Sequence, residues 1–131
     1  MQVLTRQWSY HEEADGKIET ALSNLRDWIN KNSIGYNPKI AASNQKTNPA
    51  RAVVFWCNKP ASGVSKKGPT IERETYTTFG NYENDLYKPV CKYLNGLSAA
   101  QSALVSITYT NMSGKNATMS VWYPQKQKKK I

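Results

Sequence analysis

Two neighbouring stretches near the C-terminal end alternate apolar and polar residues, and they constrain the fold more than any other feature. The apolar positions are Val105, Ile107 and Tyr109 in residues 103–110, and Met119, Val121 and Tyr123 in residues 117–124. Because successive side chains of a strand point to opposite faces, each stretch predicts a strand with one buried face. The segment between them contains Ser113-Gly114, a pair typical of turns. Together the two stretches predict a β-hairpin.

One apolar run and two helical periods predict three further elements. Residues 51–58 contain Ala-Val-Val-Phe-Trp-Cys, whose β-branched and aromatic content predicts a buried central strand. Residues 16–32 and residues 81–95 carry apolar side chains at helical spacing, and each predicts a helix with one buried face. Pro89 lacks an N–H, so we expect the second helix to begin near Lys88, with the proline in its first turn.

The remaining segments complete an expected α+β domain. Residues 3–10 and residues 70–79 predict strands, whereas residues 36–50 and residues 61–69 are typical of loops. Gly35 is expected to end the first helix in a left-handed conformation. The order β-α-β-β-α-β-β suggests a ferredoxin-like antiparallel sheet with both helices on one face and a C-terminal hairpin, and a different α+β sheet is the alternative.

The positive charge of the chain lies beyond the first helix. The formal net charge is +9 over 131 residues, with −1 in residues 1–35 and +5 in each of residues 36–82 and residues 83–131. A field of this sign favours polyanionic partners. We expect one domain over residues 1–124, followed by a basic and mobile tail over residues 125–131. Since the chain has no signal-like segment and no long apolar run, we expect a cytoplasmic protein without membrane contact.

Several catalytic and metal-binding arrangements are missing from the sequence. The single histidine, His11, rules out a histidine pair, and Cys57 and Cys91 lie too far apart for a zinc-binding motif. The chain contains no Gly-rich phosphate-binding or dinucleotide-binding motif. The segment His11-Glu12-Glu13 is interpreted as a solvated turn, and Glu72 and Glu74 as solubilising residues of a strand. We therefore expect no catalytic residue, no metal and no cofactor, and two buried free thiols.

Basic and aromatic residues lie close together at several points of the sequence. Lys and Arg neutralise phosphates and aromatic rings stack on bases, so this mixture is typical of single-stranded nucleic-acid binding. The expected binding residues are Arg6, Trp8, Tyr10, Lys66, Lys67, Arg73, Tyr76, Lys115, Trp122, Lys126, Lys128, Lys129 and Lys130. Residues 72–79 do not match the signature of RNA-recognition sheets, so no family is assigned. The opposing interpretation is that Trp8, Tyr10 and Trp122 pack inside the protein.

Three functions remain open at this point. The first is a non-enzymatic accessory protein that binds DNA or RNA, with phosphates held by Lys and Arg and bases stacked on aromatic rings. The second is an interaction or inhibitor protein, of a kind that phages and mobile elements encode, which sequesters a nucleotide or blocks an acidic protein. The third is a nuclease toxin that works with Glu, Arg, Lys and Tyr. A second copy of the chain, in a homodimer, is a further expected partner.

Overall fold

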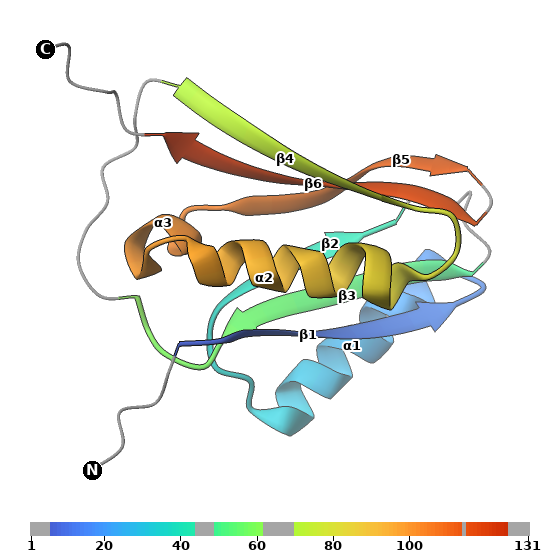
Figure 1. The fold of residues 1–131 in the computed structure, drawn as a ribbon. Coiled ribbons are helices and arrows are strands. Elements are labelled where there is room, and N and C mark those ends of the chain that lie inside the picture. The colour runs from blue at the N-terminus through green and yellow to red at the C-terminus, as the bar shows by residue number, and fades with distance from the viewer. Residues whose placement is uncertain (1–5, 44–48, 62–69, 114, 126–131) are drawn as a thin grey trace, which may run out of the picture.

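The computed structural model describes residues 6–43, 49–61, 70–113 and 115–125 (Figure 1). The strands are β1 (Trp8–Asp15), β2 (Tyr36–Ala42), β3 (Ala50–Cys57), β4 (Thr70–Thr78), β5 (Ser106–Ser113) and β6 (Asn116–Gln125). The helices are α1 (Ile18–Asn32), the π-helical turn η1 (Glu83–Tyr87), α2 (Lys88–Gly96) and the short α3 (Ala99–Ala103). The expected basic loop lies largely, and the expected tail almost entirely, outside the described residues.

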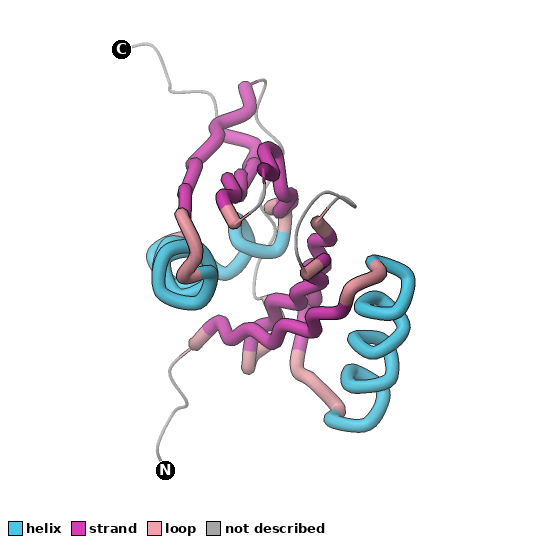
Figure 2. Tube along the Cα trace, turned by 90° about the vertical axis from the view of Figure 1, so that its right-hand side faces the viewer, coloured by secondary structure: helices cyan, strands magenta, loops and turns pink. Residues whose placement is uncertain are grey.

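The strands form two antiparallel sheets, each with three strands. Their orders are β1-β3-β2 and β4-β6-β5. The α+β class is therefore confirmed, but the ferredoxin-like arrangement, with a single sheet and both helices on one face, is not. Helix α1 packs on one face of the β1-β3-β2 sheet, and α2 lies on the other face, between the two sheets (Figures 1 and 2). Strands β2 and β5 lie against each other where the sheets meet.

Strand β2 explains why the single-sheet prediction was wrong. Residues 36–42 belong to the segment 36–50, whose Asn, Pro, Lys and Ser content is typical of a loop. The strand accommodates them with a register shift between Tyr36 and Lys39, and Asn37 adopts a positive φ of 54° within it. Of its described side chains only Ala41 is buried. A bulged strand of this kind has almost no apolar alternation, so its sequence resembles a loop.

The end of α1 also differs from the expectation for Gly35. Ser33 takes the left-handed conformation that ends the helix, with a φ of 47°. Gly35 is needed for a different reason, because a Cβ at this position would lie 2.2 Å from the carbonyl oxygen of Cys57. A glycine here therefore lets the chain pass directly beside the end of β3.

Strand β3 is the centre of the fold, and its apolar run is buried on both faces, as expected. Phe55 and Val53 face α2 and the second sheet, while Val54 and Ala52 face α1. All four side chains are fully buried. The strand therefore belongs to two apolar layers at once, which accounts for a continuous apolar run instead of an alternating one.

Strand β1 lies further along the chain than expected. It begins at Trp8 and ends at Asp15, whereas the sequence predicts a strand over residues 3–10, of which residues 3–5 lie outside the described part of the chain. The segment His11-Glu12-Glu13 is consequently part of a strand and not a solvated turn, which corrects the sequence interpretation. The polar side chains are tolerated because each has a partner: His11 contacts the Glu13 carboxylate and stacks on Trp28 with ring centroids 3.7 Å apart, and Glu12 pairs with Arg51.

In the second half of the chain, the observed elements agree more closely with those predicted from the sequence. The C-terminal hairpin is present as β5 and β6, and α2 begins at Lys88 with Pro89 in its first turn, as expected. Helix α3 was not expected, although Ser98 and Gln101 form a capping box that the sequence contains. None of the helices that the structure describes is long and apolar enough to span a membrane.

Candidate functional site

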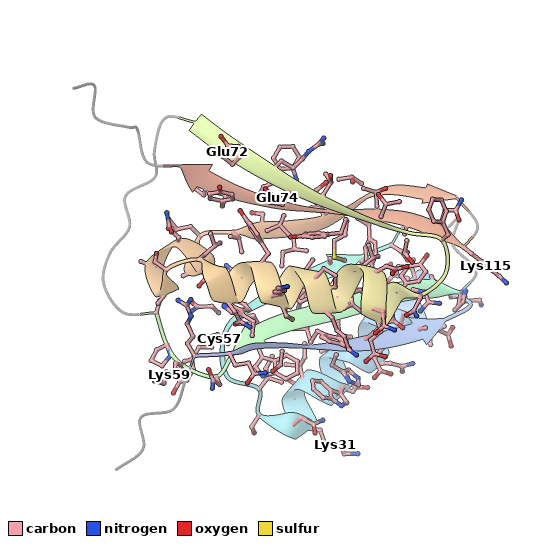
Figure 3. All side chains as sticks on the ribbon, in the orientation of Figure 1. Lys31, Cys57, Lys59, Glu72, Glu74 and Lys115 are labelled. Carbon is pink, nitrogen blue, oxygen red and sulfur yellow. The ribbon has the colours of Figure 1, made fainter. Side chains whose placement is uncertain are left out.

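The face of the β4-β6-β5 sheet that points away from α2 is the first candidate site, and we call it the outer face. The alternation of side chains along the three paired strands defines it. Its members are Ile71, Arg73, Thr75 and Thr77 of β4, Ser106, Thr108 and Thr110 of β5, and Thr118, Ser120, Trp122 and Pro124 of β6. None of these side chains is a carboxylate, because Glu72 and Glu74 alternate to the opposite face of β4. Figure 3 labels both glutamates on this strand.

A cation and an aromatic ring lie side by side on the outer face. Arg73 is directly opposite Trp122 in the strand pairing, and its guanidinium carbon is 5.2 Å from the indole centroid. Arg73 is exposed and Trp122 is half-buried. This geometry is a cation–π contact, which keeps both planar groups at the surface of the sheet.

Apart from Ile71 and Pro124, the other side chains of the outer face carry hydroxyl groups. Thr77 and Thr118 are 3.2 Å apart at their hydroxyl oxygens, and Thr110 and Ser120 are 3.1 Å apart. Ser120 is fully buried, whereas Thr77 and Thr110 are exposed, as are Thr75 and Thr108. Hydroxyls both donate and accept hydrogen bonds, so the exposed ones can turn toward an incoming anionic oxygen. The outer face therefore offers O–H donors beside one guanidinium, without carboxylates that would repel an anion.

The structure places the other predicted residues in different environments. Lys115 is exposed at the turn between β5 and β6, at the end of the sheet away from Arg73 (Figure 3). Tyr76 alternates to the inner side of β4 and packs against the core, so it does not belong to the outer face. Arg6 donates hydrogen bonds to the carbonyls of Asn95 and Leu97 at the end of α2.

Trp8 is removed from the predicted binding residues. Its side chain is only 2% exposed and lies in the core between the sheets, so its ring faces cannot stack on a base. Its Nε1–H has no hydrogen-bond acceptor among the residues that the structure describes. Six other predicted residues lie outside the described part of the chain: Lys66, Lys67, Lys126, Lys128, Lys129 and Lys130.

A second candidate site is a cavity between β1, β3 and η1, which we call the tyrosine cavity. Its volume is about 540 Å³. It is lined by Tyr10, Glu12, Arg51, Gly80, Asn81, Tyr82, Glu83 and Tyr87. The sequence analysis identified only Tyr10 of these as a binding residue. The wall thus combines phenol rings with two carboxylates and one guanidinium.

An ion pair forms the floor of the tyrosine cavity. An Arg51 Nη1 donates to Glu12 Oε1 over 2.8 Å, and both side chains are only about one-fifth exposed. Tyr87 donates its hydroxyl hydrogen to the other oxygen of Glu12, and the Arg51 guanidinium lies 4.0 Å from the Tyr82 ring centroid. Burial lowers the pKa of Arg51, but the Glu12 carboxylate has the opposite effect, and the net shift is upward. The Arg51 guanidinium therefore stays charged.

Tyr10 and Glu83 form the rim of the same cavity. The Tyr10 hydroxyl donates to Glu83 Oε1. Burial and then this hydrogen bond raise the pKa of Tyr10 well above its ordinary value, so the phenol keeps its proton at neutral pH. A carboxylate has about four lone-pair sites, and one hydrogen bond from Tyr10 leaves Glu83 able to accept others.

A groove of about 560 Å³ runs beside the cavity, between β1 and α2, and we call it the lysine groove. It is lined by Gln7, Trp8, Ser9, Tyr10, Lys88, Cys91, Lys92 and Asn95. Tyr10 therefore lines both hollows. Lys88 and Lys92 are exposed and lie one helical turn apart on α2.

Sequence reasoning missed the tyrosine cavity because it depends on long-range pairing. The alternation of β1 places Tyr10 and Glu12 on one face once the strand is known to reach Asp15. Arg51 comes from β3, where it pairs with Ala14, and Tyr87 comes from the end of η1. No local pattern links these three segments. Among the described residues, no group of three His, Cys, Asp or Glu side chains could hold a metal ion.

The two cysteines are free and buried, as expected. Burial raises the pKa of Cys91 to about 12, so the thiolate fraction at pH 8 is about 10⁻⁴. We expect Ellman's reagent to modify neither thiol rapidly in the native protein at pH 8, and to modify both in concentrated urea. Rapid modification of one native thiol would contradict this burial.

Comparisons with known proteins add no relative from which a role could be inferred. No protein-family model matches the chain. Searches of curated proteins and of solved structures also found no match.

Proposed function

We propose that this protein binds single-stranded nucleic acid, without cleaving it, on the outer face of the β4-β6-β5 sheet. The observation that carries the proposal is the contact between Arg73 and Trp122 on a face without carboxylates. An indole offers a stacking surface for any base, and such stacking contributes about 1–3 kcal/mol per base. A neighbouring guanidinium neutralises a phosphate and can itself stack.

The shape of the outer face suits an extended strand. From Lys115 to Trp122 the chain advances seven positions, which is about 23 Å at the usual rise per strand residue. The exposed hydroxyls of Thr75, Thr77, Thr108 and Thr110, on the strands that flank β6, supply hydrogen-bond donors along that length. The net charge of +9 attracts a polyanion from solution in a salt-dependent way.

The test is the affinity for a labelled oligo(dT) of about 16 nucleotides, measured by fluorescence anisotropy between about 50 and 200 mM salt. For Arg73→Ala we expect about tenfold weaker binding and a salt slope lower by about 0.7, since one phosphate contact is lost. The matched control is Arg26→Ala on α1, which removes the same charge on the far side of the other sheet. Equal losses in the two variants would overturn the proposal, since only the net charge would then matter.

The same preparation tests the proposed absence of cleavage. RNA incubated with the protein is expected to stay intact, with and without EDTA. Cleavage that is lost in Glu12→Gln would instead support a nuclease built on the ion pair of the tyrosine cavity, where Glu12 is held by Arg51 and Tyr87.

A further inference from the structure

The tyrosine cavity and the lysine groove share one residue but differ in chemistry. Tyr10 lines both hollows. The groove has Lys88 and Lys92 among its lining residues and no carboxylate. The cavity has Glu12 and Glu83 against the single cation Arg51, so its formal charge is negative. A ligand that fills both must therefore be anionic at one end and rich in hydrogen-bond donors at the other.

The groove matches a phosphate. Lys88 and Lys92 lie on the same side of α2, and both are exposed. Ammonium groups bind phosphate oxygens as point charges, without needing a fixed orientation. The amide of Asn95 donates or accepts from the same wall, where its oxygen already accepts from the backbone N–H of Trp8.

The cavity matches a flat, uncharged ring system and not a second phosphate. A phosphate there would face the carboxylates of Glu12 and Glu83, which repel it. Of the three rings in the wall, Tyr82 and Tyr87 are buried and Tyr10 is half-buried, so Tyr10 is the ring against which a base can stack. A volume of about 540 Å³ lies within the range of small-ligand sites.

We infer that the tyrosine cavity and the lysine groove together form a binding site for a guanine nucleotide, separate from the outer face. The base lies against Tyr10 with its edge toward Glu83, and the phosphate lies at Lys88 and Lys92. Guanine has two adjacent donors, N1–H and the N2 amine, which match the two oxygens of one carboxylate. Adenine has an unprotonated ring nitrogen at the N1 position, which would oppose the Glu83 oxygens.

The hydrogen bond from Tyr10 positions the carboxylate for this role. Because the Tyr10 hydroxyl donates to Glu83, it restricts the orientation of that carboxylate in the wall of the cavity. Arg51 is held by Glu12 and by the Tyr82 ring, so its remaining N–H groups have a fixed direction. Arginine is the usual partner of the O6 and N7 acceptors of guanine. The site therefore has matching groups for both edges of the base.

The experiment is isothermal titration calorimetry of the whole protein with GMP, AMP, IMP and guanosine. We expect GMP to bind at least about tenfold more tightly than AMP, since AMP leaves the carboxylate without donors. IMP, which lacks the N2 amine, is expected between the two. Guanosine is expected to bind more weakly than GMP, because it makes no contact with Lys88 or Lys92.

Three variants locate the site. Glu83→Gln is expected to remove the preference for GMP over AMP, and Lys88→Ala to weaken GMP without changing guanosine. Lys31→Ala, an exposed lysine on α1 that Figure 3 labels, is the charge-matched control and is expected to leave both unchanged. Equal binding of GMP and AMP, no binding of either, or equal effects of Lys88→Ala and Lys31→Ala would overturn the inference.

These results are independent of the outer-face proposal. Arg73→Ala is expected to leave GMP binding unchanged, and Glu83→Gln to leave oligo(dT) binding unchanged, since oligo(dT) contains no guanine. If GMP binding fails while Arg73→Ala still weakens oligo(dT), only the nucleotide site is wrong. If the reverse holds, only the outer face is wrong.

Discussion

Replacing Phe55 with alanine is expected to lower the free energy of unfolding by about 3–5 kcal/mol, the range for large core truncations. Phe55 is fully buried in β3 and belongs to the core cluster that joins both sheets and α2. Its ring lies 6.0 Å from that of Tyr87 and 6.5 Å from that of Tyr10. The alanine variant therefore leaves a cavity where three layers meet, which neighbouring backbone cannot close.

Phe79→Ala is the matched control for this substitution. Phe79 is 77% exposed directly after β4, so the same truncation is expected to change stability by at most about 0.5 kcal/mol. Urea unfolding monitored by circular dichroism gives both values. Similar losses for the two variants would contradict the placement of β3 at the centre of the fold.

Replacing Arg51 with alanine is expected to lower the free energy of unfolding by about 2–3 kcal/mol, slightly below the usual cost of breaking a buried pair. The discount reflects the remaining exposure of about one-fifth of each side chain. The variant leaves the Glu12 carboxylate without its cation and removes the guanidinium from the Tyr82 ring. An unpaired, partly buried charge is the main cost.

Arg26→Ala provides the comparison for an exposed pair. Arg26 and Asp27 are 3.4 Å apart on α1, and their side chains are 71% and 69% exposed. Solvent screens this pair, so its loss is expected to cost at most about 0.5 kcal/mol. Thermal and urea unfolding of both variants measure the difference. An Arg51→Ala variant as stable as Arg26→Ala would mean that the ion pair does not stabilise the cavity floor.

The sequence predicted those elements whose pattern is local. The hairpin of β5 and β6, the central strand β3, helix α1 and the start of α2 at Lys88 all follow from periodicity and proline chemistry. The partition into two sheets could not be predicted in this way. It depends on β2, whose bulge and proline hide the strand, and which pairs with β3 at the edge of the first sheet.

The residues of the candidate sites show the same difference between what local sequence predicts and what depends on tertiary packing. Arg73 and Trp122 were expected from their residue types, and they meet because β4 and β6 pair in the register that sets them opposite each other. Trp8 was assigned to the surface because its amphipathic ring suits a stacking role equally well, and only tertiary packing places it in the core. The partners of Glu12 come from β3 and η1, so its role needed the fold.

The most direct test of the outer-face proposal uses the four tryptophans as reporters. In the ¹⁵N-labelled protein, each indole N–H gives its own signal: Trp122 reports the outer face, Trp28 and Trp56 report the α1 side, and Trp8 reports the core beside the lysine groove. On addition of oligo(dT), we expect the Trp122 signal to shift with saturation while those of Trp28 and Trp56 stay in place. A shift of Trp28 or Trp56 with an unchanged Trp122 would contradict binding at the outer face.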